Sequence, residues 1–206
     1  MRIGIDFGTT FSLPAGLING TAATLLPGGA YGMESVFYYD KRIGILIGKR
    51  AENLGEKKPA NVVRNVKMFI SDTSATSFIL DGKTFNKKEI VGHIIKEVVQ
   101  TACEETKRRQ LISQEIDGAV ISVPAAFNIR ELDFIRQAAE NNAGLKVLGF
   151  IREPVAAAIS YFNAPSAEDK KTILFATFFI VNRKMKKCFR LLRKVFWKTE
   201  RKFGSK

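Results

Sequence analysis

The stretch Ile3-Gly4-Ile5-Asp6-Phe7-Gly8-Thr9-Thr10 begins as an apolar strand and ends in a glycine followed by two hydroxyl residues. Its two isoleucines alternate with a glycine and an aspartate, so a strand would bury one face and carry Asp6 out at its end. The pattern predicts a short buried strand that presents one carboxylate at its carboxyl end.

The residues after this strand are suited to hold a phosphate and a metal ion. Gly8 lets the backbone turn without a Cβ, and the N–H groups and hydroxyls of Thr9 and Thr10 can point at an anion. Asp6 would repel a phosphate, so its natural partner is a hydrated divalent cation that bridges to phosphate oxygens. The stretch therefore predicts a magnesium–nucleotide site. The alternative is an ordinary turn, because Asp-x-Gly is common at the end of any strand.

The composition indicates a globular protein with a nearly balanced body and a basic end. The chain has 206 residues, 46% of them hydrophobic, which is enough for a sizeable core in one large or two small domains. Residues 183–206 hold eleven Lys or Arg and one acid, a net charge of +10, which leaves +3 of the total +13 for residues 1–182. The excess charge therefore belongs to the tail.

Cysteine usage and hydropathy indicate a reducing, cytoplasmic setting. Cys103 and Cys188 have no C-x-x-C spacing and no histidine near them, so neither a disulfide framework nor a zinc site is indicated. The N-terminus enters a strand directly and shows no secretory signal. The longest apolar run, Ile173 to Val181, is far short of the roughly 20 residues of a membrane-spanning helix, and we interpret it as a strand.

Turn residues mark several short strands. Asn19-Gly20 lies between two apolar runs and predicts a hairpin. Residues 36–39 and 43–47 predict a second pair of strands. Residues 117–123, which close at a proline, and residues 147–151 predict two more.

Capping signals mark the helices. Asn86-Lys87-Lys88-Glu89 precedes an apolar stripe that predicts a helix of about four to five turns. His93 lies off this stripe, which favours a surface position over a ligand role. Asn128-Ile129-Arg130-Glu131 predicts a second helix, and Glu153-Pro154 opens a third that runs through Phe162. The alternation of strands and helices predicts a three-layer α/β domain on a mixed sheet.

Together these segments resemble the nucleotide-binding domain of the heat-shock protein 70 (DnaK-type) chaperones, in the actin-like ATPase superfamily. Four blocks in order carry the resemblance. They are Ile3–Thr10, similar to the first phosphate loop; Val62–Ile70, where Lys67 falls on the position of the catalytic lysine; Val120–Asn128 with the helix after it; and Gly149–Ala158, similar to the second phosphate-side connection and its helix. Their order and spacing are specific in a way that no single block is.

The resemblance implies an actin-like ATPase (ribonuclease H-like) fold, an α/β mixed sheet with flanking helices and a small inserted α+β subdomain. Residues 1–175 would form the first lobe of a two-lobed clamp. Within it, residues 1–39 and 115–175 would form the core subdomain and residues 40–114 the inserted subdomain. Residues 176–206 would be a basic tail outside the lobe.

The resemblance also implies ATP or ADP and Mg²⁺ as ligands. Position by position, Asp6 would organise the hydrated magnesium and take part in catalysis. Gly8, Thr9 and Thr10 would contact the phosphates.

Two further residues would act on the phosphoryl group. Lys67 would place a cation beside the γ-phosphate, where charge develops, and Glu153 would orient either the attacking water or a water in the second shell of the magnesium ion. The plain alternatives are a solvated surface lysine at position 67 and, at position 153, an acid favoured by a helix N-terminus.

The sequence departs from the family at a coupling position. Pro124 matches the proline that the family uses to couple nucleotide state to the rest of the molecule. Its usual arginine partner, eight residues on, falls here on Leu132. The arginine expected for coupling to a substrate domain is therefore missing from its position.

A larger departure follows Lys171–Phe175, which resembles the strand that leads into the second phosphate loop, Asp-Leu-Gly-Gly-Gly-Thr. Residues 176–183 replace that loop, and no glycine lies between Gly149 and Gly204. The second lobe and the peptide-binding domain are not recognised either. One hypothesis is a reading-frame change or truncation after residue 175, which predicts that another frame of the gene encodes the loop.

We expect an ATPase-type, ATP-binding lobe of a DnaK-type molecular chaperone, with weak or no activity in these 206 residues alone. The partners that the family implies are unfolded peptides, a J-domain protein and a nucleotide exchange factor. Two alternatives are a module that binds nucleic acid or an anionic membrane through residues 183–206, less favoured than an accidental tail, and another actin-like ATPase or sugar kinase fragment.

Overall fold

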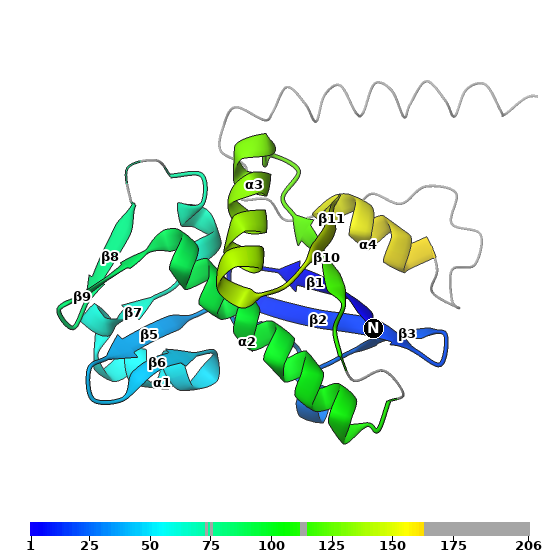
Figure 1. Ribbon diagram of the computed structural model, residues 1–206, viewed down its shortest axis with the longest axis horizontal. Coiled ribbons are helices and arrows are strands. Elements are labelled where there is room, and N and C mark those ends of the chain that lie inside the picture. The colour runs from blue at the N-terminus through cyan, green and yellow to red at the C-terminus, as the bar shows by residue number, and fades with distance from the viewer. Residues whose placement is uncertain (73, 75, 112–114, 163–206) are drawn as a thin grey trace, which may run out of the picture. The chain divides into compact units, whose positions relative to one another are not determined.

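The computed structural model describes residues 1–72, 74, 76–111 and 115–162 (Figure 1). By its internal contacts the chain divides into two compact units, residues 1–160 and 161–206, and the first unit holds the sheets described here. The predicted strand at 173–181 and the basic tail lie outside the described residues.

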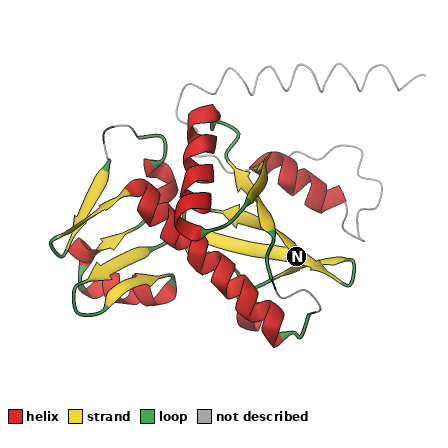
Figure 2. Cartoon of the chain, viewed as in Figure 1, coloured by secondary structure: helices red, strands yellow, loops and turns green. Residues whose placement is uncertain are grey.

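The first unit is built on a mixed sheet of six strands (Figure 2). The strands are β1 (Arg2–Phe7), β2 (Phe11–Ile18), β3 (Thr21–Thr24), β4 (Met33–Glu34), β10 (Gly118–Val123) and β11 (Val147–Arg152). Their order is β11-β10-β1-β2-β3, with β4 paired to β2. The strands β1, β10 and β11 run parallel, whereas β2 is antiparallel to β1 and to β3. The predicted mixed α/β sheet is therefore confirmed.

The predicted hairpin joins β2 and β3. Asn19 and Gly20 have φ angles of 52° and 79°, and a two-residue type I′ turn requires positive φ at both central positions. Glycine adopts this conformation at no steric cost, and asparagine is among the few other residues that tolerate it. The second predicted pair also forms, as β5 (Phe37–Asp40) and β6 (Gly44–Ile47).

Smaller sheets and a short helix lie between residues 37 and 86. β5 pairs with β6 on one side and with β7 (Val62–Val63) on the other, and β8 (Ser77–Leu80) pairs with β9 (Lys83–Asn86). The helix α1 (Lys49–Lys57) packs against β5 through the buried Ala51. The predicted limits of the inserted subdomain, residues 40–114, stay a prediction.

The helix α2 (Lys87–Arg108) begins at the predicted capping box of Asn86 and Glu89. It has 22 residues, about six turns, so the predicted length of four to five turns is too short. The apolar stripe stops at Ala102, but Glu105 then pairs with two arginines on the next turn. Local ion pairs thus stabilise the helix beyond its apolar stripe.

His93 on α2 is half-buried, so it is more covered than a surface position predicts. Its ring centroid lies 5.7 Å from that of Phe37, a core residue of β5. Burial lowers the pKa of His93 below its ordinary value of 6.5, against the smaller opposing effect of the Glu89 carboxylate. A contact from a distant strand covers a helix face that the local pattern assigns to solvent.

Two more helices follow β10 and β11. The helix α3 (Ile129–Gln137) begins at the second predicted capping box and continues as a π-helical turn, η4 (Ala138–Asn142). The helix α4 (Glu153–Phe162) starts directly after β11, with Pro154 in its first turn. Among the described residues, no helix is long and apolar enough to span a membrane.

The main core lies between the sheet and the helices α2 and α3. Alternate residues of β1 and β10 contribute to it, as does the predicted stripe of α2. Its members include Ile3, Ile5, Phe7, Ala119, Ile121, Val123, Ile90, Ile94, Ile95, Val98, Ile135 and Ala138. Because side chains alternate along a strand, the neighbouring residues of β1 and β10, Asp6 among them, lie on the other face.

Candidate functional site

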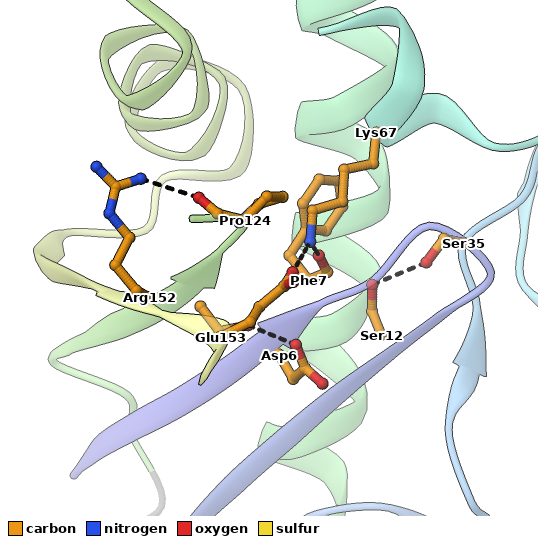
Figure 3. A network of polar contacts seen from close by, with 9 residues as sticks. Asp6, Phe7, Ser12, Ser35, Lys67, Pro124, Arg152 and Glu153 are labelled. Atoms are coloured by element: carbon orange, nitrogen blue, oxygen red, sulfur yellow. Dashed lines mark hydrogen bonds and ion pairs between the residues drawn. The ribbon is translucent and has the colours of Figure 1, made fainter. Parts of the chain in front are cut away.

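The carboxyl ends of three parallel strands meet at one edge of the main sheet. In the sheet register, Asp6 of β1 pairs with Ser122 of β10, which pairs with Ile151 of β11. Two residues further on, β10 and β11 lead to Pro124 and Glu153. In open α/β sheets, ligands bind outside the carboxyl ends of the strands. The topology therefore brings three predicted site residues to one edge (Figure 3).

The Asp6 carboxylate is exposed and accepts a hydrogen bond from the Ser122 hydroxyl. The two side chains share a face because their residues are register partners in parallel strands. Among the described residues, no group of three or more His, Cys, Asp and Glu could hold a metal ion. A single oriented carboxylate open to solvent nevertheless fits Mg²⁺, which keeps several waters and takes one or two protein carboxylates together with phosphate.

The loop between β1 and β2 is held by close backbone contacts. A Cβ at Gly8 would lie 2.0 Å from the carbonyl oxygen of Phe11, so this turn excludes any other residue. The carbonyl oxygen of Thr10 accepts a hydrogen bond from the amide of Ser35 at 2.8 Å. Thr9 is half-buried and Thr10 is exposed. The loop is thus anchored while it presents its threonines at the sheet edge.

Lys67 is buried, with 5% of its side chain exposed. It lies in the short 3-10 helix η3 (Val66–Phe69). Its ammonium donates to the carbonyl oxygen of Phe7 and, at 2.5 Å, to Oε1 of Glu153. A buried charge is stable only when it is paired and hydrogen-bonded. Lys67 is therefore no solvated surface lysine: its charge is directed to the sheet edge.

Glu153 is the first residue of α4, where the helix dipole favours an acid. Its side chain is 26% exposed and pairs with Lys67, 86 residues away in the sequence. The helix N-terminus therefore accounts for an acid at position 153, and Glu153 also makes a long-range ion pair with Lys67.

Pro124 follows β10 and begins the loop to α3. Leu132 packs against the main core, so position 132 offers this proline no charged partner. Instead, Nη1 of Arg152 donates to the carbonyl oxygens of Pro124 and Phe127, at 2.9 and 2.7 Å. An arginine thus reaches the proline from a different strand.

Two polar residues at this edge, Ser122 and Arg152, are not indicated by the sequence patterns above. Both lie near the end of an otherwise apolar strand: Ser122 is two residues before Pro124, and Arg152 directly precedes Glu153. Parallel pairing of the strands at 117–123 and 147–151 would have aligned both with the edge. The sequence feature that could have identified them is a polar residue near the end of an apolar strand. This feature points to the site only once the order of the strands in the sheet is known.

Comparison with known proteins assigns the family. A family model described as "Hsp70 protein" matches residues 2–177, so the chain belongs to the Hsp70 family. This match confirms the predicted Hsp70 family. It favours that family over the alternative prediction of another branch of the actin-like superfamily.

The chain is also similar to individual chaperones. It is 32% identical over 182 residues to the chaperone protein HscA homolog of Shewanella loihica, 35% identical over 172 residues to that of Tolumonas auensis, and 33% identical over 175 residues to that of Neisseria meningitidis serogroup B. These alignments cover 77% or 78% of this chain and 28% of each relative. The chain therefore spans little more than a quarter of the length of these relatives.

Proposed function

We propose that this chain carries the first, ATP-binding lobe of a DnaK-type chaperone, which in the whole protein binds and hydrolyses MgATP. The observation that carries the proposal is the ion pair of the buried Lys67 with Glu153 at the carboxyl edge of the sheet, beside Asp6. Desolvating an ammonium is costly. Placing one at a ligand-binding edge is useful where negative charge must be stabilised.

The phosphate and metal roles fall on the end of β1 and the loop after it. Asp6 would hold hydrated Mg²⁺, with its carboxylate oriented by Ser122. Gly8, Thr9 and Thr10 would contact phosphate oxygens through backbone N–H groups and hydroxyls. Bound magnesium would neutralise charge on the phosphates.

The catalytic roles fall on the ion pair. An ammonium has three donors, and the contacts of Lys67 with Phe7 and Glu153 use two, which leaves a third for a phosphoryl oxygen. Glu153 accepts from Lys67 through Oε1, and its partly exposed carboxylate can orient a water molecule for attack.

We further propose that these 206 residues bind MgATP weakly and turn it over negligibly by themselves. The family resemblance implies a clamp in which two lobes enclose the nucleotide, and this chain aligns with 28% of its relatives' length. The edge described above supplies groups for the phosphates and the metal. Contacts to one end of a ligand give a small part of its full affinity.

Titration of the full chain with MgATP, followed by amide NMR, tests the proposal. We expect magnesium-dependent shifts at Gly8, Thr9, Thr10 and Glu153, with half-saturation at about 1 mM or above. Asp6→Asn should weaken them. The matched control is Asp117→Asn, which alters an exposed carboxylate just before the amino end of β10 and should change nothing.

Two results would contradict parts of this proposal. Half-saturation in the micromolar range would support the site but show that the weak affinity is wrong. An absence of shifts at these residues up to about 10 mM MgATP, or shifts indifferent to Asp6→Asn, would overturn the nucleotide site.

Partners are proposed at the level of the family: unfolded peptides, a J-domain protein and a nucleotide exchange factor. The cytoplasmic setting stays a prediction. The tail-mediated binding of nucleic acid or membranes and the frame-change hypothesis concern residues outside the described part of the chain.

A further inference from the structure

Arg152 joins two elements at the edge of the site. It is the last residue of β11 and is half-buried. Its Nη1 donates to the carbonyl oxygens of Pro124 and Phe127 (Figure 3 shows the Pro124 contact). Both acceptors lie in the loop between β10 and α3, so one side chain fastens that loop to the end of β11.

The loop that Arg152 contacts is itself held in place. The amide of Phe127 donates to the carbonyl oxygen of Pro124 at 3.2 Å, which closes a turn, and the Phe127 ring packs into the main core. The two carbonyl groups are therefore presented in a defined geometry. A guanidinium is planar and permanently charged, so its two hydrogen bonds restrict both the position and the direction of the end of β11.

Glu153 follows Arg152 directly and begins α4. Its carboxylate has to reach the Lys67 ammonium, at 2.5 Å, from the first turn of this helix. Small rotations of that turn would carry the carboxylate away from its partner. Misplacement of a reacting group by about 1 Å is enough to cost a large factor in rate, so the orientation of this turn matters.

We propose that Arg152 is a positioning residue, which holds the end of β11 on the β10–α3 loop and thereby keeps the Glu153 carboxylate against Lys67. Its consequence for ATP turnover rests on the proposed function. The positioning itself is a property of the protein without nucleotide, and can be measured there.

Arg136 offers a matched control. Its Nη1 donates to the carbonyl oxygen of Val147 at 3.0 Å, and its guanidinium lies 5.3 Å from the ring centroid of Phe150. Both arginines therefore bond a backbone carbonyl and connect β11 to the α3 side of the sheet. The hydrogen bond of Arg136 is to the first residue of β11, at the opposite end of the strand from Glu153, and its ring contact is to Phe150, three residues before Glu153. Neither contact is to the loop that holds the end of β11, so the loss of Arg136 should affect stability without moving the ion pair.

The test compares Arg152→Met, Arg152→Gln and Arg136→Met in the full chain without nucleotide. NMR reports the hydrogen exchange of the Lys67 ammonium and the carboxyl carbon shift of Glu153. Arg152→Met should speed ammonium exchange by about tenfold or more, because two charged hydrogen bonds are lost, and should shift the carboxyl resonance. Arg152→Gln keeps an amide donor and should change both signals less, in the same direction. Arg136→Met should change neither.

An ion pair unchanged in Arg152→Met would overturn the proposal. An equal change in Arg136→Met would also overturn it, because the effect would then be a general loosening. If Arg152→Met does not fold, unchanged signals in Arg152→Gln would have the same meaning.

A parallel MgATP titration of the unmodified chain separates this inference from the proposed function. If MgATP causes no shifts but Arg152→Met disturbs the ion pair, the nucleotide function fails and the positioning stands. If MgATP binds as proposed and the ion pair ignores Arg152, the positioning fails and the nucleotide function stands.

Discussion

Two ion pairs in this Hsp70-family chain, each with one buried partner, are built in opposite ways. Glu105 is 1% exposed and pairs with Arg108 and Arg109, which follow it within about one turn of α2. Lys67 is 5% exposed and pairs with Glu153, 86 residues away on another element. The first pair can form as soon as the helix forms. The second exists only once the sheet has brought η3 and α4 together.

This difference separates a pair that stabilises one helix from a pair to which the proposed function assigns a catalytic role. The Glu105 pair stabilises the last turns of α2, where the chain leads toward the amino end of β10. The Lys67 pair carries the cost of desolvating a cation and of ordering two distant segments. The proposed function gives a reason for this cost, because it places the Lys67 charge beside a bound phosphate.

Glu153→Ala is expected to destabilise the fold most, because it leaves the Lys67 ammonium buried without a counter-charge. The free energy of unfolding should fall by about 3 kcal/mol, measured by urea denaturation at neutral pH. Lys67→Met removes the buried charge itself and should cost less. In Lys67→Met/Glu153→Met, apolar contacts replace the whole pair, and most of the loss should be recovered. A loss in Glu153→Ala no larger than in Lys67→Met would contradict this account of the pair.

The local pair should make stability depend on acid pH. Hydrogen bonding from Arg108 is the largest cause that lowers the pKa of Glu105 from its ordinary value of 4.5 to about 2, against the opposing effect of burial. As the pH falls, the unfolded chain takes up this proton first. The contribution to stability is therefore complete above about pH 4.5 and is lost as the pH falls toward 2.

Glu105→Gln should lower the free energy of unfolding by about 1–2 kcal/mol near neutral pH, after allowance for solvent screening around the arginines. It should also flatten the decline in stability below pH 4.5. Urea denaturation across this range measures both effects. The matched control is Glu104→Gln, which alters the neighbouring exposed carboxylate. A decline of equal slope in both variants would assign the acid sensitivity to other groups.

His93 provides a weaker pH effect without an ion pair. Burial lowers its pKa below 6.5, so the unfolded chain binds this proton first, and stability falls as the pH drops below 6.5. His93→Gln should flatten that slope, with a smaller effect than that of Glu105→Gln, measured by urea denaturation between mildly alkaline and mildly acidic pH. Glu105→Gln should leave this slope intact, because its window lies at lower pH. A His93→Gln slope equal to that of the unmodified chain would rule out a contribution from His93.

The elements predicted correctly depend on neighbouring residues. The Asn19-Gly20 hairpin and the helix starts at Asn86 and Asn128 each rest on contacts within a few positions. The length of α2 is underestimated because Glu105 lies beyond the apolar stripe. His93 is more covered than its sequence pattern predicts because Phe37, from a distant strand, packs against it.

Residue types and their order were enough to predict which strand ends in a carboxylate, which turn needs glycine, and the family to which the chain belongs. The folded chain was needed to show that Lys67 is buried against Glu153 and that Arg152 supplies the contact to Pro124. Such facts depend on the parallel register of β1, β10 and β11. Register is set by the burial of whole strand faces, and no local window of sequence contains it.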